Sequence, residues 1–81
     1  MTAKEMFEEL GYIQSANDDY EIVYNYDFSD FDTYSYICFN KNDEKIEMEN
    51  NIIVGSDITI SVLKAINKQI EELGWINENN N

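Results

Sequence analysis

The sequence of residues 59–75 is Thr-Ile-Ser-Val-Leu-Lys-Ala-Ile-Asn-Lys-Gln-Ile-Glu-Glu-Leu-Gly-Trp, and it predicts a complete amphipathic helix. Apolar residues recur in it at steps of three and four, which places them on one stripe: Ile60, Leu63, Ile66, Ile70 and Leu73. Thr59 suits the N-cap, and Gly74 before Trp75 is typical of a left-handed helix end. The apolar stripe needs a sheet to cover it, so the rest of the chain is expected to supply one.

The first residues of the chain predict a second and shorter helix. Residues 2–10 carry apolar side chains at helical spacing, and Gly11 follows them as a C-terminal signal. Thr2 and Glu5 have the spacing of a capping box, in which each side chain accepts a hydrogen bond from the backbone of the other residue. A helix is therefore expected near each end of the sequence.

Between the two helices the sequence favours strands, since apolar and polar side chains alternate there. The predicted strands cover residues 20–28, 33–39 and 45–49. Residues 12–15 have the composition of a short edge strand, but the pattern leaves its pairing open. The expected fold is α+β, in the order helix, three-stranded antiparallel β-meander, helix, with both helices on one sheet face. One domain of residues 1–76 is expected, followed by a frayed polar tail at residues 77–81.

The charge of the chain is strongly negative. It has 17 Asp and Glu against 5 Lys, with no Arg and no His, for a net charge of −12. Direct binding to nucleic acid or to an anionic membrane is therefore disfavoured. Because 43% of the residues are hydrophobic and 14% aromatic, the acidity belongs to a folded protein and not to a disordered tail. A single cysteine and the lack of a long apolar run favour a cytoplasmic protein.

The residue inventory argues against an enzyme. Without His or Arg, the common nucleophile–base pairs and guanidinium clamps are missing, and the 3 Gly form no phosphate-binding loop. Cys38 lies in a predicted strand among apolar and aromatic neighbours, which favours a core thiol over a reactive one. Neither a catalytic residue nor a cofactor is expected.

A calcium site is the alternative for three carboxylates that lie close in sequence. Asp27, Asp30 and Asp32 surround a predicted loop, where their oxygens could gather around Ca²⁺. Their spacing departs from the EF-hand loop, which needs a glycine in its middle and a glutamate at its end. Solvated carboxylates are the simpler interpretation, and no metal is expected.

Carboxylates concentrate in the middle of the chain. Residues 17–49 hold ten of them against Lys41 and Lys45, which leaves a net charge of −8 in 33 residues. Displayed on a sheet and its turns, these charges would form a fixed anionic surface that imitates duplex DNA, which has one charge per ~1.7 Å of axis. The competing interpretation is that the acidity only keeps the protein soluble. The strands also carry tyrosines, which either pair across strands or form a recognition surface: Tyr20, Tyr24, Tyr26, Tyr34 and Tyr36.

The two ends of the chain carry a resemblance. Residues 1–12 and 58–75, above all Leu-Lys-Ala-Ile-Asn-Lys-Gln-Ile-Glu-Glu-Leu-Gly-Trp, resemble the ends of short uncharacterised proteins encoded by phages and prophages of low-GC Gram-positive bacteria. The resemblance covers about a third of the chain and implies a scaffold in a bacterial host, but no activity. In size, acidity and order of elements the chain is also similar in kind to small acidic anti-CRISPR proteins, which occupy the DNA-binding groove of an RNA-guided nuclease.

The resemblance and the charge together lead to a functional expectation. The chain is expected to be a non-enzymatic, phage-encoded inhibitor, an acidic DNA mimic that blocks a basic nucleic-acid-binding groove of a host defence nuclease such as a CRISPR effector. The expected partner-binding residues supply charge and aromatic anchors: Asp27, Asp30, Asp32, Glu47, Glu49, Tyr24, Tyr34 and Tyr36. The alternative is a small structural or protein–protein interaction module whose acidity serves solubility. A monomer or a weak homodimer is expected in either case.

Overall fold

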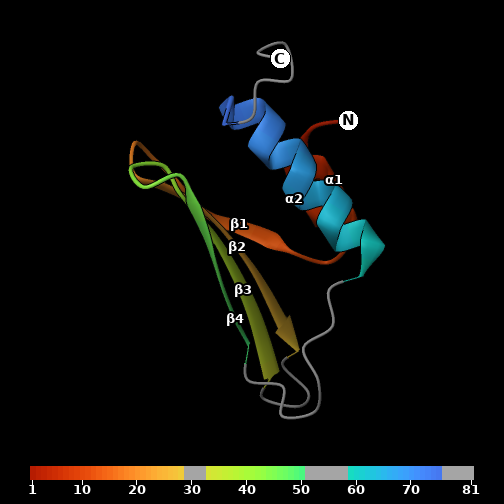
Figure 1. Cartoon of the computed structure of the whole chain (residues 1–81). Helices are drawn as coiled ribbons and strands as arrows, with labels where there is room; N and C mark the ends of the chain where they lie inside the picture. Colours follow the sequence, from red (N-terminus) through yellow and green to blue (C-terminus); the bar gives the residue numbers. More distant parts are fainter. Residues whose placement is uncertain (29–32, 51–58, 76–81) are drawn as a thin grey trace.

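A computed structural model describes residues 1–28, 33–50 and 59–75 of the chain. Its elements follow in the order α1 (Ala3–Glu9), β1 (Ile13–Asn17), β2 (Glu21–Phe28), β3 (Thr33–Asn40), β4 (Lys45–Asn50) and α2 (Ile60–Leu73). The strands form one antiparallel sheet in the order β1-β2-β3-β4. The two helices lie side by side on one side of this sheet (Figure 1). The predicted α+β class, with a helix before and a helix after the strands, is confirmed.

The prediction of three strands is wrong, because the segment before the first predicted strand also joins the sheet. This segment is β1, which pairs antiparallel with β2 and has a register shift between Gln14 and Ala16. Its five residues alternate between exposed and half-buried, and neither side of the strand is strongly apolar. The sequence signal is weak for that reason, and the strand forms because β2 offers it a ladder of backbone hydrogen bonds.

Both helices begin at the residues that the sequence predicts. The Thr2 hydroxyl accepts from the Glu5 N–H at 3.1 Å, and the Glu5 carboxylate accepts from the Thr2 N–H at 2.8 Å, so the capping box of α1 is confirmed. In α2 the Thr59 hydroxyl accepts from the Val62 N–H at 3.2 Å. Each bond satisfies a donor that the first turn of a helix leaves free.

Each helix is followed by a glycine in the left-handed backbone conformation. Gly11 and Gly74 have φ angles of 96° and 74°. After α2 the Trp75 N–H donates to the Ile70 carbonyl at 3.2 Å, and the equivalent bond closes α1 at 3.0 Å. This is the Schellman pattern predicted for α2, and it turns the aromatic residue after each glycine back toward the helix.

The core lies between the helices and one face of the sheet. Its centre is the Phe7 ring, which stacks on the Tyr24 ring with the centroids 4.0 Å apart. Phe39 meets both rings at a steep angle, with centroid distances of 6.2 and 6.1 Å. The buried cluster combines residues of α1, α2 and the two central strands: Phe7, Ile22, Tyr24, Ile37, Phe39, Ala65 and Ile66. Both helices therefore cover the same sheet face, as predicted.

The buried face of α2 differs from the predicted stripe. Ile60 is 67% exposed and Leu63 is 43% exposed, whereas Ala65, Ile66 and Gln69 are buried. The helix is thus rotated relative to the face that its large apolar residues define. Ala65 and Ile66 belong to the buried core cluster, and the buried Gln69 accepts a hydrogen bond from the Tyr24 hydroxyl.

The two helices are also joined through the N-terminus of α1. The Ala3 N–H donates to Oε2 of Glu72 on α2 at 2.8 Å, across a separation of 69 residues. Ala3 is fully buried, so this backbone donor would otherwise lack a partner. The carboxylate also lies at the positive end of the α1 dipole, which favours its charge.

Candidate functional site

The face of the sheet turned away from the helices carries half of the predicted partner-binding residues, and we call it the helix-free face. Side chains alternate along a strand, so the residues between the core positions point to this side. The register places Tyr36 beside Glu49, and Cys38 beside Glu47. The charged and aromatic side chains described on this face of β2, β3 and β4 are Glu21, Tyr34, Tyr36, Lys45, Glu47 and Glu49.

The two carboxylates of β4 are exposed and lie on the same face of the strand. Glu47 and Glu49 are two residues apart, which corresponds to about 7 Å along a strand. Lys45 Nζ lies 3.6 Å from Glu47 Oε1 and 3.8 Å from Asp43 Oδ2, so two carboxylates share this cation. The Tyr34 hydroxyl donates to Glu49 Oε1 at 3.2 Å, and this bond raises the pKa of Tyr34. The face therefore keeps a net negative charge at neutral pH.

Cys38 lies at the centre of the helix-free face but is only 3% exposed. Its thiol donates to Glu21 Oε1, with a sulfur–oxygen distance of 3.5 Å. Burial raises the pKa of the Cys38 thiol, and the nearby Glu21 and Glu47 charges raise it further. A hydrogen bond with Cys38 is the main cause that raises the pKa of Tyr36 to about 12. Both groups stay protonated at neutral pH, which disfavours the thiolate that a nucleophile would need.

A second group of carboxylates lies at one end of the sheet, where the turn after β1 meets the turn after β3 (Figure 1). The Asp18 carboxylate accepts from the N–H groups of Tyr20 at 2.8 Å and Glu21 at 3.0 Å, which lowers the pKa of Asp18. Lys41 joins the turns, because its N–H donates to the Tyr20 carbonyl and its ammonium donates to the Asp18 carbonyl. Asp18 is thus structural although it is exposed, and the other exposed carboxylates at this end are Asp19, Asp43 and Glu44.

The structure brings four of the eight predicted partner-binding residues together: Tyr34, Tyr36, Glu47 and Glu49. Asp27 is opposite Tyr34 in the register of β2 and β3, so its backbone lies at the same end of the helix-free face. Asp30 and Asp32 lie outside the described residues, and the calcium interpretation of this group stays untested. The sequence analysis does not single out Glu21. Glu21 and Asp27 are nevertheless an even number of residues apart on β2 and therefore belong to the same side of that strand.

Other features of the described chain are less suited to binding a ligand, a metal ion or a membrane. A shallow groove of about 180 Å³ between the helices is small beside ligand pockets, which hold roughly 300 to 1,000 Å³; its lining is Met1, Met6, Glu9, Leu10, Ser61 and Lys64. Within residues 1–28, 33–50 and 59–75, no group of three or more His, Cys, Asp or Glu is placed to hold a metal ion. Neither α1 nor α2 has the length and apolar character of a membrane span.

No protein family, curated protein or solved structure matches this chain.

Tyr24 does not belong to the candidate surface, contrary to the sequence-based expectation. The residue is fully buried on the helix side of β2. Its hydroxyl donates to Gln69 Oε1 at 2.6 Å and accepts from Gln14 Nε2 at 3.2 Å, so strand β1, strand β2 and helix α2 share one polar network. Burial raises the pKa of Tyr24. This tyrosine stabilises the fold and cannot anchor a partner.

Removal of the Tyr24 hydroxyl is expected to cost about 1 to 3 kcal/mol, because Tyr24→Phe leaves the buried carbonyl oxygen of Gln69 without its donor. The double variant Tyr24→Phe/Gln69→Leu should recover part of this loss, since both polar partners are then gone. Urea unfolding followed by circular dichroism measures both changes. Tyr20→Phe, at a position 68% exposed, is the matched control and should change the free energy of unfolding by less than about 0.5 kcal/mol. Equal costs for Tyr24→Phe and Tyr20→Phe would contradict the network.

Proposed function

We propose that this protein is a non-enzymatic inhibitor that docks its helix-free face into a basic nucleic-acid-binding groove of a host protein, as an acidic DNA mimic. The main support is the helix-free face, on which Glu47 and Glu49 lie beside Tyr34 and Tyr36 on two paired strands. A phage origin, and a host defence nuclease such as a CRISPR effector as the target, belong to the same proposal. They rest on the resemblance of the chain ends and on the acidity.

The number of carboxylates on the helix-free face limits how closely this face can imitate the charge of duplex DNA. The 6 residues of β4 span about 20 Å, a length over which duplex DNA has roughly 12 phosphate charges. The described carboxylates of the face are fewer: Glu21, Glu47 and Glu49. The protein would therefore replace a few phosphates of the nucleic acid, and additional affinity must come from uncharged contacts.

Tyrosines supply those contacts. Tyr34 is 40% exposed, and its hydroxyl is held on the Glu49 carboxylate. An arginine of the partner could therefore stack its guanidinium on this ring and pair with the adjacent carboxylate at once. A Tyr–Glu pair of this kind suits a groove that normally binds phosphates and stacked bases. Tyr36, which is half-buried and two residues further along β3 on the same face, extends this aromatic surface.

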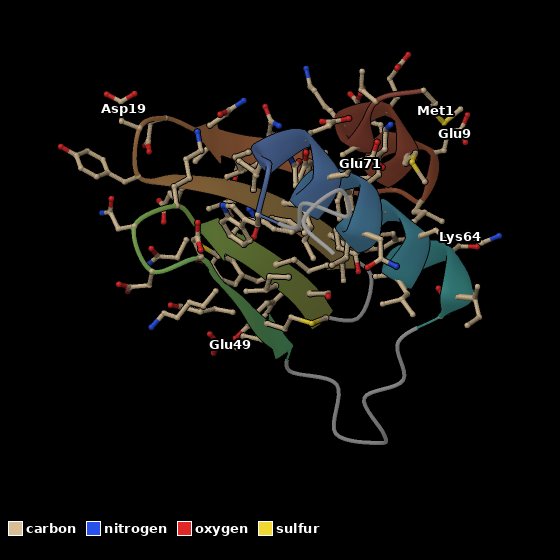
Figure 2. All side chains as sticks on the ribbon, turned by 45° about the horizontal axis from the view of Figure 1, so that its top comes forward. Met1, Glu9, Asp19, Glu49, Lys64 and Glu71 are labelled. Carbon is tan, nitrogen blue, oxygen red and sulfur yellow. The ribbon has the colours of Figure 1, made fainter. Side chains whose placement is uncertain are left out.

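Neutralisation of the two β4 carboxylates is expected to weaken partner binding about 10- to 100-fold and to reduce its salt dependence. The variant Glu47→Gln/Glu49→Gln removes two charges and changes shape little. Its matched control, Glu9→Gln/Glu71→Gln, removes two charges from the helices, away from Glu49 (Figure 2). Tagged wild-type protein and both variants are used to capture partners from a nuclease-treated lysate of a low-GC Gram-positive bacterium. The captured proteins are then challenged with duplex DNA at low and at high salt.

The proposal is supported if the wild type and the control capture a nucleic-acid enzyme, if duplex DNA releases it, and if the β4 variant does not retain it. Screening of exposed charges should also weaken capture as salt rises. Binding that is indifferent to DNA, to salt and to the β4 charges would overturn the mimicry. Recovery of the protein alone would favour the structural or interaction module instead.

A further inference from the structure

The two edges of the sheet are protected to different degrees. At one edge, β1 is short and has the register shift between Gln14 and Ala16, and such irregularities hinder pairing with another strand. At the other edge, β4 pairs with β3 in an unbroken register. In the part of the chain that the structure describes, β3 is the only neighbour of β4 in the sheet. The outer backbone groups of β4 therefore form a template for a further strand.

The side chains of β4 leave this edge accessible. In Figure 1 β4 lies at the edge of the sheet farthest from the helices. Met48 points to the core side of the sheet and yet is 44% exposed, because the helix layer does not cover it fully. Ile46, on the same side, is only half-buried. The edge thus combines backbone groups that pair with no other strand of the described chain with a largely exposed apolar side chain.

We infer that the outer edge of β4 pairs with the same edge of a second copy of this chain. The pairing is antiparallel and two-fold, and it joins two four-stranded sheets into one. Its centre is Glu47, and the sequence around it is self-complementary: Lys45 faces Glu49 of the second copy, and Ile46 faces Met48. The arrangement makes two oppositely charged pairs and two apolar pairs, which are the cross-strand contacts that stabilise sheets.

Other registers are less favourable. Opposite residues of an antiparallel pair point to the same side of the sheet. The two-fold axis must therefore lie where one residue of β4 faces its own copy, and not between two successive residues. An axis at Met48 would place Glu47 opposite Glu49 twice, with like charges in contact. An axis at Ile46 would place β4 against the turn before it, where Glu44 has a φ of 52° and leaves the extended conformation. The axis at Glu47 keeps five residues of each strand paired.

Charge keeps this dimer weak. Two chains of net charge −12 repel each other, and Glu47 faces Glu47 across the axis. Salt screens both terms over a Debye length of about 10 Å at 0.1 M, so the dimer should tighten as ionic strength rises. Binding of a basic partner has the opposite salt dependence. The dimer is independent of the proposed function, although it would join two helix-free faces into one longer acidic surface.

Sedimentation equilibrium of the purified full chain, at several protein and salt concentrations, tests the inference. Lys45→Glu should weaken the dimer about 10-fold, because it replaces two attractive pairs by two repulsive ones. The charge swap Lys45→Glu/Glu49→Lys restores both pairs and should return the dissociation constant to within about 3-fold of the wild type. Circular dichroism confirms that each variant is folded.

Glu47→Gln provides a readout that separates the inference from the proposed function. It removes the like-charge pair at the axis, so the dimer should tighten about 3- to 10-fold, whereas binding to a basic groove should weaken. Met48→Lys should weaken the dimer, since it adds charge at the apolar pair. A protein that stays monomeric at high salt, or a dimer whose dissociation constant is unchanged by Lys45→Glu and by Met48→Lys, would overturn the inference.

Discussion

The Phe7→Ala variant is expected to lose about 3 to 5 kcal/mol of stability, the largest effect of any single truncation in this protein. Phe7 is fully buried and its ring stacks on Tyr24 at 4.0 Å, so its removal leaves a cavity between α1 and the sheet. An 81-residue domain has a free energy of unfolding of about 4 to 12 kcal/mol at 0.05 to 0.15 kcal/mol per residue. At the lower end of this range, the loss would leave the variant largely unfolded.

Urea unfolding of the wild type and of Phe7→Ala, followed by far-ultraviolet circular dichroism, measures the loss. Phe7→Leu keeps most of the volume and should lose less. Glu8→Ala, the exposed neighbour on the same helix, is the matched control and should remain within about 0.5 kcal/mol of the wild type. A cost below about 1 kcal/mol for Phe7→Ala would place this ring outside the core.

The Gly11→Ala variant is expected to lose about 2 to 4 kcal/mol, considerably more than the corresponding change at Gly74. Both glycines have positive φ angles, so alanine costs about 1 to 2 kcal/mol at either site. A Cβ on Gly11 would also overlap the Tyr26 ring, with Cδ2 and Cζ at 3.1 Å, whereas no atom of the described residues other than its chain neighbours lies within 4 Å of a Cβ on Gly74. Tyr26 is held edge-on against Tyr12, with centroids 5.4 Å apart, so its ring cannot move aside freely.

Thermal and urea unfolding of the two glycine variants give the difference directly. Gly74→Ala serves as the matched control, because it has the same conformational cost without the overlap. The excess cost of Gly11→Ala should shrink when Tyr26 is shortened to leucine, since the overlapping ring atoms are then absent. Equal costs at the two glycines would mean that the approach of Gly11 to Tyr26 is not present in solution.

The helix ends could be predicted closely from the sequence because their chemistry is local. Thr2, Glu5 and Thr59 cap N–H groups only three residues away, and the glycine after each helix is required by its own backbone angle. No distant contact can change these requirements. The rotation of α2 is different, because Gln69 is buried through a bond to Tyr24, 45 residues away, which no helical pattern reveals.

The candidate site could be predicted only in part, because the faces of the strands depend on register. Tyr24 and Tyr36 both sit at even positions, and the sequence favours placing them together. In the structure Tyr24 pairs with Ile37, so even positions of β2 share a face with odd positions of β3. A connection longer or shorter by one residue would reverse this relation. The acidity of β4 could be predicted without that knowledge, since Glu47 and Glu49 alternate with apolar residues on their own strand.

The bond between Ala3 and Glu72 has a consequence for synthesis on the ribosome. The sheet pairs strands that follow one another, so it can begin to form as the chain emerges, but α2 is made only after β1, β2, β3 and β4. At roughly 5 to 20 residues per second, α1 waits about 3 to 14 s for its partner helix, because 69 residues separate the two ends of the bond. During that interval the apolar side of the nascent sheet lacks the cover of α2 and is open to chaperones and proteases. The core therefore closes only after α2 has been synthesised, and a chain truncated before α2 is expected to be degraded.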